Sequence, residues 1–386
     1  MPMRKGKNGQ LHIAMIGHKR VPSREGGVEV VVWELSQRLK DRGYSVDCYN
    51  RSGYHVSAAD YDRIPGKRGY YRDGVRILTV PTVRNPKLNA IIYAVLGTLR
   101  ALFGHYDVIH YHAEGHCLML WLPKLFGIRT VATIHGLDWQ RAKWGNFASR
   151  MLLTGEAIAA KRADEVIVLS HHVQEYFYQK YGRKTHYIPN GIQAPTKCPA
   201  QEIREKWGLS GGDYILTLSR LVPEKGLHYL LEAFHGIDTE VKLVIAGGSG
   251  GAASYVEKLH QMGEKDGRVI FTGFVSGRPL EELMSNAMIF CLPSDVEGMA
   301  VSLLEAMSYG NCCLVSDIPE NLEVTEDKAE SFAHGDVQDL KKKLQELLAN
   351  KGRRELYRQE AASFIMNKHD WETMTTETEK LYHGGS

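Results

Sequence analysis

The sequence has few cysteines and no long hydrophobic run. Its six cysteines show no Cys-x-x-Cys spacing, so the pattern predicts scattered reduced thiols rather than a disulfide framework or a zinc motif. No apolar stretch approaches the length that spans a bilayer, and the basic N-terminus lacks the apolar core of a signal peptide. We therefore expect a cytoplasmic protein without a transmembrane helix.

Several catalytic signatures are also missing. The absence of a Gly-x-Ser-x-Gly elbow disfavours an ordinary serine hydrolase, and the seventeen histidines form no cluster with zinc-ligand spacing. Asp60-Tyr61-Asp62 has an Asp-x-Asp spacing, but it lies in a polar loop rich in Gly and Arg, which predicts a solvated turn. The glycine run 247–251 lacks a complete Gly-x-Gly-x-x-Gly fingerprint and predicts a flexible loop near a cleft.

What the sequence does contain is an alternation of apolar strands and helices that occurs twice. The strands expected in the first half are Leu11–Ile16, Ser45–Tyr49, Val75–Val80, Val108–Tyr111, Thr130–Ile134 and Glu165–Leu169, with helices over Val28–Arg42 and Asn89–Phe103. After Pro189-Asn190-Gly191 come strands Tyr214–Leu218, Val241–Ala246, Val269–Phe271 and Met288–Leu292, with helices over Leu227–Phe234 and from about Ala300. A chain of 386 residues with 43% hydrophobic content can bury two cores. The pattern predicts an α/β protein with two doubly wound parallel sheets and a hinge near Asn190.

The most informative segment runs from Pro293-Ser294 to Met307. Glu297 lies in a loop between a strand and a helix, and Glu305 lies in the second turn of that apolar helix. Each glutamate alone is more simply explained as a solvated or helix-start acid. Together, they could accept hydrogen bonds from vicinal sugar hydroxyls, while the start of the helix, at Gly298, Met299 and Ala300, would favour a phosphate.

This Glu-x7-Glu spacing, preceded by Pro-Ser and followed by Glu305-Ala306-Met307-x-x-Gly310, resembles the donor site of family 4 glycosyltransferases with the GT-B fold. The resemblance implies two Rossmann-like domains facing a central cleft, retention of anomeric configuration, and no bound metal or other cofactor. It also implies that Glu297 contacts the donor sugar and that Glu305 holds the ribose hydroxyls. Met299 and Ala300 stand where the family often has an aromatic residue and a glycine, so the identity of the donor sugar stays open.

Two further loops follow expected strands and resemble the same family. Gly26 and Gly27 precede a helix and match the glycine pair that approaches the donor phosphates; taken alone, they predict a flexible turn. Arg220 and Lys225, in Arg220-x4-Lys225-Gly226, match the family's phosphate clamp. The guanidinium fork and the ammonium charge would stabilise a departing diphosphate.

A third segment begins at Thr133-x-His135. In the resemblance, His135 lies beside the sugar and completes the catalytic candidates with Arg220, Lys225 and Glu297. Gly136-Leu137-Asp138-Trp139 and the following Gln-Arg-Ala-Lys-Trp resemble a bacterial rhamnosyltransferase-like subgroup, as does the segment 316–321. Trp139, Arg141, Lys143 and Trp144 are candidates for an acceptor or membrane contact, and a packed loop explains them equally well.

The family resemblance also makes 366–386 a C-terminal helix that crosses back to the first domain. The expected domains are therefore 1–190 on the acceptor side, 191–365 for the nucleotide-sugar, and this helix.

The two halves of the chain differ in charge. Residues 1–190 contain 28 Lys and Arg against 15 Asp and Glu, whereas the remainder contains 20 against 30. A basic first half predicts an anionic partner for that half alone. Because no nucleic-acid-reading motif is present, we favour an anionic membrane surface or a lipid phosphate, which would add a peripheral location on the inner face of the cell membrane. The alternative is that the excess charge only aids solubility.

The function that fits these features is transfer of a sugar from a nucleoside-diphosphate-sugar donor to an acceptor hydroxyl. The acceptor would be a saccharide or a lipid-linked saccharide of a bacterial cell-surface polysaccharide or glycolipid. Two alternatives stay open. One is a GT-B epimerase or phosphorylase, and the other is a catalytically silent nucleotide-sugar-binding partner in a polysaccharide assembly complex.

Overall fold

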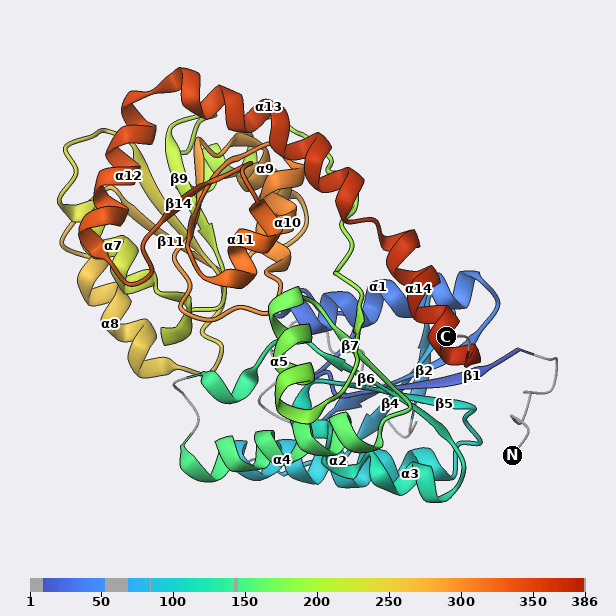
Figure 1. Cartoon of the computed structure of the whole chain (residues 1–386). Coiled ribbons are helices and arrows are strands. Elements are labelled where there is room, and N and C mark those ends of the chain that lie inside the picture. The colour runs from blue at the N-terminus through green and yellow to red at the C-terminus, as the bar shows by residue number, and fades with distance from the viewer. Residues whose placement is uncertain (1–9, 53–68, 84, 142–144, 385–386) are drawn as a thin grey trace. The chain divides into compact units, whose positions relative to one another are not determined.

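A computed structural model describes residues 10–52, 69–83, 85–141 and 145–384, and these form two compact units (Figure 1). The first unit comprises Met1–Gly191 together with Trp371–Ser386, and the second comprises Ile192–Asp370. The chain therefore leaves the first unit at Gly191 and re-enters it at Trp371. The sequence placed these two boundaries at 190/191 and 365/366.

The first unit is built on an eight-stranded sheet. Its elements, with η marking 3-10 helices, are β1 (His12–Ile16), α1 (Gly27–Asp41), β2 (Ser45–Arg51), β3 (Gly69–Arg72), β4 (Val75–Val80), α2 (Pro86–Leu102), β5 (Val108–His112), η1 (Glu114–Met119), α3 (Trp121–Leu125), β6 (Arg129–Ile134), η2 (Asp138–Gln140), α4 (Asn146–Arg162), β7 (Glu165–Val168), α5 (His171–Tyr181), β8 (His186–Tyr187) and α14 (Trp371–His383). The strand order is β3-β4-β2-β1-β5-β6-β7-β8, and every pair is parallel except β3 with β4. Strands buried on both faces explain the near-continuous apolar runs in the sequence.

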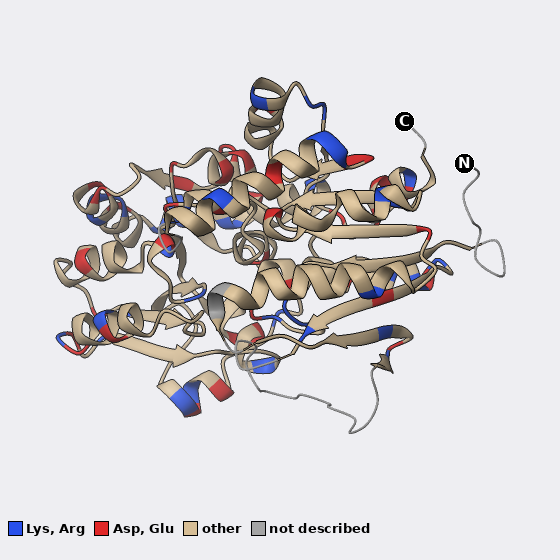
Figure 2. Cartoon of the chain, turned by 90° about the horizontal axis from the view of Figure 1, so that it is seen from below, with Lys and Arg blue, Asp and Glu red and all other residues tan. Residues whose placement is uncertain are grey.

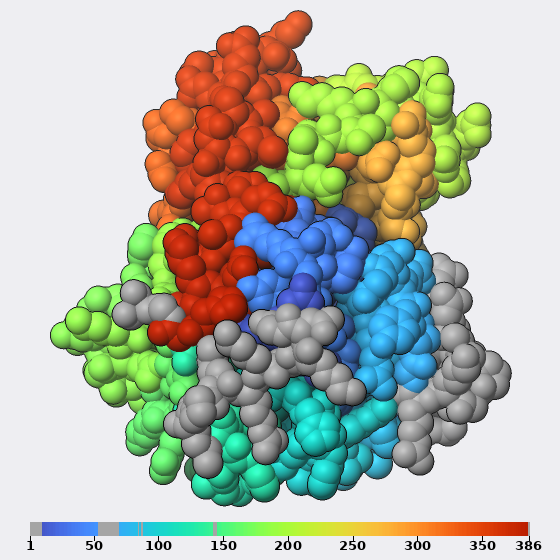
Figure 3. All heavy atoms as spheres, turned by 90° about the vertical axis from the view of Figure 1, so that its right-hand side faces the viewer, coloured from blue at the N-terminus to red at the C-terminus, as the bar shows by residue number. Residues whose placement is uncertain are grey.

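Helices cover both faces of this sheet. Figure 1 shows α2, α3 and α4 on one side and α1 with α14 on the other. The space-filling view shows the C-terminal helix, in red, against the N-terminal segments, in blue (Figure 3). Arg42, just after α1, donates to Glu379 at 2.7 Å and to Glu372 at 2.8 Å, and the hydroxyl of Tyr44 donates to Glu379 at 2.5 Å. These contacts attach the returning helix to the first unit.

The second unit is built on a six-stranded sheet. Its elements are α6 (Glu202–Trp207), β9 (Tyr214–Leu218), η3 (Pro223–Lys225), α7 (Leu227–His235), β10 (Lys242–Ala246), α8 (Ala253–Gly263), β11 (Val269–Gly273), α9 (Arg278–Asn286), β12 (Ile289–Leu292), α10 (Val301–Ser308), β13 (Cys312–Ser316), α11 (Pro319–Thr325), β14 (Glu330–Phe332), α12 (Val337–Ala349) and α13 (Lys351–Lys368). The order is β11-β10-β9-β12-β13-β14, with all pairs parallel. Both units therefore have the doubly wound α/β architecture that the sequence predicted.

Two surface properties of the chain bear on its partners. Figure 2 shows Lys and Arg dispersed along the ribbon among Asp and Glu rather than gathered into one run. Among the described residues, no helix combines the length and the apolar character that crossing a membrane requires.

Candidate functional site

The second sheet has a topological switch point between β9 and β12. From β9 the chain passes to β10 and β11 on one side, and β12, β13 and β14 then follow on the other side. The loops that leave the carboxyl ends of β9 and β12 therefore diverge, and in open α/β sheets such a crevice is where ligands bind. These two loops contain Arg220, Lys225 and Glu297, three residues that the sequence analysis selected.

An ion pair joins the two loops. Lys225 Nζ contacts Glu297 Oε1, and Ser294 Oγ donates to the same oxygen at 2.6 Å. Both charged side chains are largely buried. The pairing therefore holds the carboxylate in a fixed position and compensates a buried charge that would be costly unpaired.

The same loops touch through their backbones. Gly226 has a φ of +63°, and a Cβ on it would lie 1.9 Å from the carbonyl oxygen of Pro293. The backbone N–H of Asp295 also donates to the carbonyl of Glu224 at 3.0 Å. Only glycine allows this approach at position 226, so the Lys-Gly pair in the sequence has a structural reason as well as the proposed chemical one.

Helix α10 begins at Val301, four residues after Glu297. Ala300 precedes its first turn with no side-chain cap, and Gly298, Met299 and Ala300 are buried. The start of a helix presents backbone N–H donors and a partial positive charge, which suits an anion. The helix packs its Leu303, Leu304, Ala306 and Met307 face inward.

Glu305 lies on the other side of α10. It is half-buried, as is Ser302 three residues earlier. The apolar face of the helix turns away from it, so Glu305 does not pay the full cost of burial. A half-buried carboxylate at this place can accept hydrogen bonds from a diol.

Arg220 lies against the glycine-rich loop that follows β10. A Cβ on Gly250 would lie 3.3 Å from Arg220 Cβ, and Leu221 N donates to the carbonyl of Gly248 at 2.8 Å. The φ of Gly247 is +145°, and a Cβ there would lie 1.8 Å from Ser219 O. The glycine run is therefore a supporting wall for the Arg220 segment. Sequence reasoning treated it only as a flexible loop, and its position immediately after a strand was the signal for this role.

The first sheet has its own switch point, between β1 and β5. Gly17, after β1, has a φ of +127°, and a Cβ there would lie 2.0 Å from the carbonyl oxygen of His112, the last residue of β5. Gly26 caps α1 and Gly27 begins it. A Cβ on Gly26 would lie 2.3 Å from Glu29 Oε2, while Glu29 Oε1 accepts from Lys19 N at 2.8 Å. Gly26 thus gives room to a carboxylate at the start of the helix. The sequence analysis gave Glu29 no role.

His135 is half-buried and lies beside two buried histidines of the first sheet, His110 and His112. Its Nε2 lies 3.1 Å from His112 Nδ1, and the His112 ring stacks on His110 at 4.2 Å. Burial lowers the pKa of His135 to about 4 and that of His110 to about 3. At neutral pH His135 is therefore uncharged, and it can orient a hydroxyl through a hydrogen bond but carries no positive charge to offer.

The next segment uses its polar groups internally. Trp139 Nε1 donates to the buried carboxylate of Glu156 at 3.1 Å, and the Trp139 ring packs against the core. Arg141 Nε pairs with Asp138 at 2.8 Å. For these two residues, the contacts favour the packed-loop alternative over a membrane or sugar contact. Lys143 and Trp144 lie outside the described residues, as do Asp60 and Asp62.

No group of three or more His, Cys, Asp or Glu side chains within the described part of the chain is arranged to hold a metal ion.

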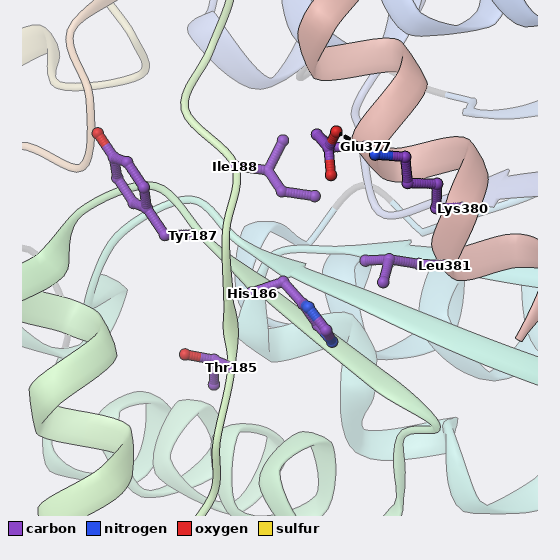
Figure 4. A pocket seen from close by; sticks show the side chains of 7 residues that line it. All are labelled: Thr185, His186, Tyr187, Ile188, Glu377, Lys380 and Leu381. Carbon is purple, nitrogen blue, oxygen red and sulfur yellow. Dashed lines mark hydrogen bonds and ion pairs between the residues drawn. The ribbon is translucent and has the colours of Figure 1, made fainter. Parts of the chain in front are cut away.

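A surface pocket of about 310 Å³ lies between the edge strand β8 and α14 (Figure 4). It is lined by Thr185, His186, Tyr187, Ile188, Glu377, Lys380 and Leu381, none of which was selected from the sequence.

Comparison with known proteins identifies the family. Residues 25–194 match the family described as Glycosyltransferase Family 4, and residues 199–364 match Glycosyl transferases group 1. The chain belongs to the glycosyltransferases that these two descriptions name. The two matches place the β9 and β12 loops of this glycosyltransferase in the second family module and His135 in the first.

Individual relatives are distant but cover much of the enzyme. An uncharacterized glycosyltransferase of Methanocaldococcus jannaschii is 26% identical, over 96% of this chain and 98% of its own length. A GDP-mannose-dependent alpha-(1-6)-phosphatidylinositol monomannoside mannosyltransferase of Mycolicibacterium smegmatis is 26% identical, over 75% of this chain and 76% of its own. The crystal structure of Anabaena HepE in complex with UDP-glucose has a TM-score of 0.79 at 18% identity, covering 97% of this chain and 100% of that one. This structural likeness shows the GT-B fold.

Proposed function

We propose that this glycosyltransferase moves a sugar from a nucleoside-diphosphate-sugar to an acceptor hydroxyl, in the synthesis of a cell-surface polysaccharide or glycolipid. The observation that supports it most is the Lys225–Glu297 pair at the switch point beside the start of α10. Relatives that use GDP-mannose or bind UDP-glucose support a nucleotide-sugar donor. The phosphatidylinositol-linked acceptor of one relative supports a lipid-linked acceptor.

In this proposal, each residue of the second unit has a separate task. Glu305 accepts hydrogen bonds from the ribose hydroxyls, and Glu297 accepts them from the donor sugar. Arg220, Lys225 and the first-turn N–H groups of α10 stabilise the negative charge that grows on the departing diphosphate. Because Lys225 already pairs with Glu297, one side chain links the sugar subsite to the phosphate subsite.

The first unit is assigned the acceptor side. The neutral imidazole of His135 orients a hydroxyl, and Gly26 and Gly27 allow close backbone approach of an anionic group at α1. We propose a retaining, metal-independent reaction, in which the diphosphate helps to deprotonate the acceptor and the protein supplies orientation and charge stabilisation. The resemblance of segments 136–144 and 316–321 supports a rhamnosyltransferase-like subgroup.

Donor binding is tested first, by thermal shift against UDP-, GDP- and dTDP-sugars. A specific donor should raise the melting temperature in a concentration-dependent way, because a ligand that binds only the folded state stabilises it. Glu305→Gln should lose this shift, whereas the matched variant Glu264→Gln, which changes an exposed glutamate in the same unit, should keep it. A shift that survives Glu305→Gln would contradict the ribose assignment.

Catalysis is tested separately, by release of free nucleoside diphosphate with and without acceptor. A transferase requires the acceptor for stoichiometric release. A silent nucleotide-sugar-binding protein would show the thermal shift but release no diphosphate under either condition.

A further inference from the structure

The outer face of α2 is apolar, which is unusual for a solvent-exposed helix. Leu88, Leu96 and Leu99 are exposed along it, and Phe103 at its end is 81% exposed. The opposite face, which includes Tyr93, is buried in the core. A surface helix normally places charged residues outward, and α2 instead presents leucines at helical spacing.

Neighbouring elements extend this apolar face. Helix α3, which packs against α2 and α4, has an exposed Trp121, and Leu125 is 73% exposed. Phe126 follows at 64%, and Phe147 in the first turn of α4 is 69% exposed. Figure 1 shows α2, α3 and α4 together on the side of the first sheet that is opposite α1. The exposed apolar residues of this docking face are Leu88, Leu96, Leu99, Phe103, Trp121, Leu125, Phe126 and Phe147.

The charges on this face have one sign. Helices α2, α3 and α4 together contain six basic residues and a single acidic one, Glu156. One of the six, Lys124, is paired with Asp164, which lies just after α4. Glu156 is fully buried and accepts hydrogen bonds from Trp139, Tyr176 and Tyr181. The exposed charged residues of these helices include Arg150, Lys161 and Arg162, all on α4.

Exposed apolar side chains beside exposed basic ones, on helices with no exposed acidic residue, are suited to binding an anionic lipid bilayer. The acyl boundary of a bilayer takes up leucine and aromatic side chains, while anionic headgroups attract lysine and arginine. A second copy of the chain fits less well, because a symmetric contact would place the same basic residues opposite one another. Nucleic acid would supply phosphates but nothing to cover the row of leucines.

We propose that the docking face formed by α2, α3 and the exposed side of α4 binds the surface of an anionic lipid bilayer. The protein lies on the membrane and does not span it. This places the membrane contact away from Trp139 and Arg141, whose polar groups are engaged within the unit. The inference goes beyond the proposed transfer reaction and does not depend on it, because the binding can be measured without donor or acceptor.

The first experiment is co-sedimentation of the full chain with vesicles of pure phosphatidylcholine and of phosphatidylcholine with phosphatidylglycerol. We expect binding to the anionic vesicles that weakens as salt rises, since screening reduces only the charged part of the attraction. The triple variant Leu96→Ser, Leu99→Ser and Phe103→Ser should reduce vesicle affinity at least tenfold. Because all three residues are exposed, the fold should persist, as circular dichroism would show.

Matched control variants distinguish vesicle binding through the docking face from nonspecific binding through other exposed residues. Leu322→Ser with Leu356→Ser changes two exposed leucines of the second unit, and vesicle binding should not change. Arg150→Glu with Lys161→Glu should weaken binding to anionic vesicles, whereas the second-unit pair Lys265→Glu with Lys342→Glu should have a smaller effect.

Three outcomes would overturn the proposal. One is vesicle binding that the triple variant leaves intact. Another is a protein that binds no vesicle of either composition. The third is a dimer in solution that the triple variant converts to monomer, which would show that a second copy covers this face. Diphosphate release with a soluble acceptor should be the same for wild type and the triple variant, so failure of docking is distinguishable from failure of transfer.

Discussion

Lys225 and Glu297 are 72 residues apart in the chain, yet their side chains form an ion pair where the loops of β9 and β12 diverge. Ser294 donates a second hydrogen bond to the same carboxylate oxygen. The pair therefore does two things: it closes the two loops against each other, and it positions a carboxylate and an ammonium group at the switch point of the sheet. Substitutions at this pair are expected to affect stability and turnover together.

Arg220→Ala and Lys225→Ala should each reduce turnover by roughly a hundredfold or more, because each removes a preorganised charge from the leaving group. Lys225→Ala should also destabilise the protein by about 3–5 kcal/mol, because it removes the cation from a largely buried ion pair with Glu297. Steady-state kinetics of both variants and urea unfolding of Lys225→Ala measure these losses. A Lys225→Ala protein of wild-type stability would contradict the pairing account.

A double variant gives a sharper test of the same ion pair. The double variant Lys225→Met with Glu297→Gln removes both charges of the ion pair. Its loss of stability should therefore be smaller than the sum of the two single losses. Additive losses would indicate that the two side chains do not interact.

Glu305→Ala should weaken donor binding by about 1.5–3 kcal/mol, the range for a hydrogen bond to a charged group. We expect the lower part of that range because Glu305 is half-buried. The fold should be unaffected, and Glu264→Ala serves as the control. Calorimetric titration with the donor or with bare nucleoside diphosphate gives the two dissociation constants. An unchanged constant in a folded Glu305→Ala protein would rule out the ribose contact.

The first unit should lose stability as the pH falls below 6.5. Burial lowers the pKa of His18 and His135 from 6.5 to about 4, and it also lowers the pKa of His110, His112 and His116. Below 6.5 the unfolded chain binds protons that the folded unit does not, so stability is fully present above that pH and is lost as the pH falls towards 4. Each such proton contributes a slope of about 1.4 kcal/mol per pH unit.

One buried acid opposes this trend. Burial and the nearby carboxylates raise the pKa of Glu114 well above its usual value, so protonation of Glu114 favours the folded state. The stabilisation that Glu114 alone gains at low pH is smaller than the combined destabilisation from the five histidines. Urea unfolding at pH 7.5, 6.5, 5.5 and 4.5, followed by tryptophan fluorescence, tests the balance, because five of the six tryptophans belong to the first unit. A flat profile between pH 6.5 and 4.5 would contradict it, and His110→Gln should reduce the slope.

Trp139→Phe should destabilise the first unit by about 1–3 kcal/mol, since it removes one donor from the fully buried carboxylate of Glu156. Tyr176, Lys180 and Tyr181 still contact that carboxylate, which should keep the loss in the lower part of the range. Vesicle binding should not change. A variant of wild-type stability that no longer binds vesicles would instead restore the membrane role that the sequence suggested for Trp139.

The sequence predicted the two parallel sheets because strands buried on both faces leave nearly continuous apolar runs. Val75–Val80 and Tyr214–Leu218 were placed with the bounds that the structure has for β4 and β9. It did not predict β3, whose Tyr71 is exposed on an edge strand, or the two-residue strand β8. β3, β8 and the three-residue strand β14 are short or exposed and lack the apolar run on which such predictions depend. The sequence analysis also missed β13, although all five of its residues are buried.

The sequence predicted the positions of the candidate site residues but not the contacts between them. Lys225 and Glu297 stand in local motifs that follow strands, and their loops lie on neighbouring strands. Their mutual ion pair depends on sheet order, which no local pattern contains. The environment of His135 was out of reach, because its partner His112 lies on a different strand. The exposure of the α2 leucines also required the structure, since an apolar helix looks the same in sequence whichever face is covered.

Acceptor-dependent release of nucleoside diphosphate tests the proposed transfer most directly. Purified protein is incubated with the nucleotide-sugar that gives the largest thermal shift, with and without an extract of cell-surface glycolipid acceptors, before and after treatment with EDTA. We expect release that requires the acceptor, persists after EDTA, and falls about a hundredfold or more in Arg220→Ala. Release that is independent of acceptor, or absent with every donor that binds, would contradict the account. Activity that EDTA abolishes and manganese restores would contradict its metal-independent form.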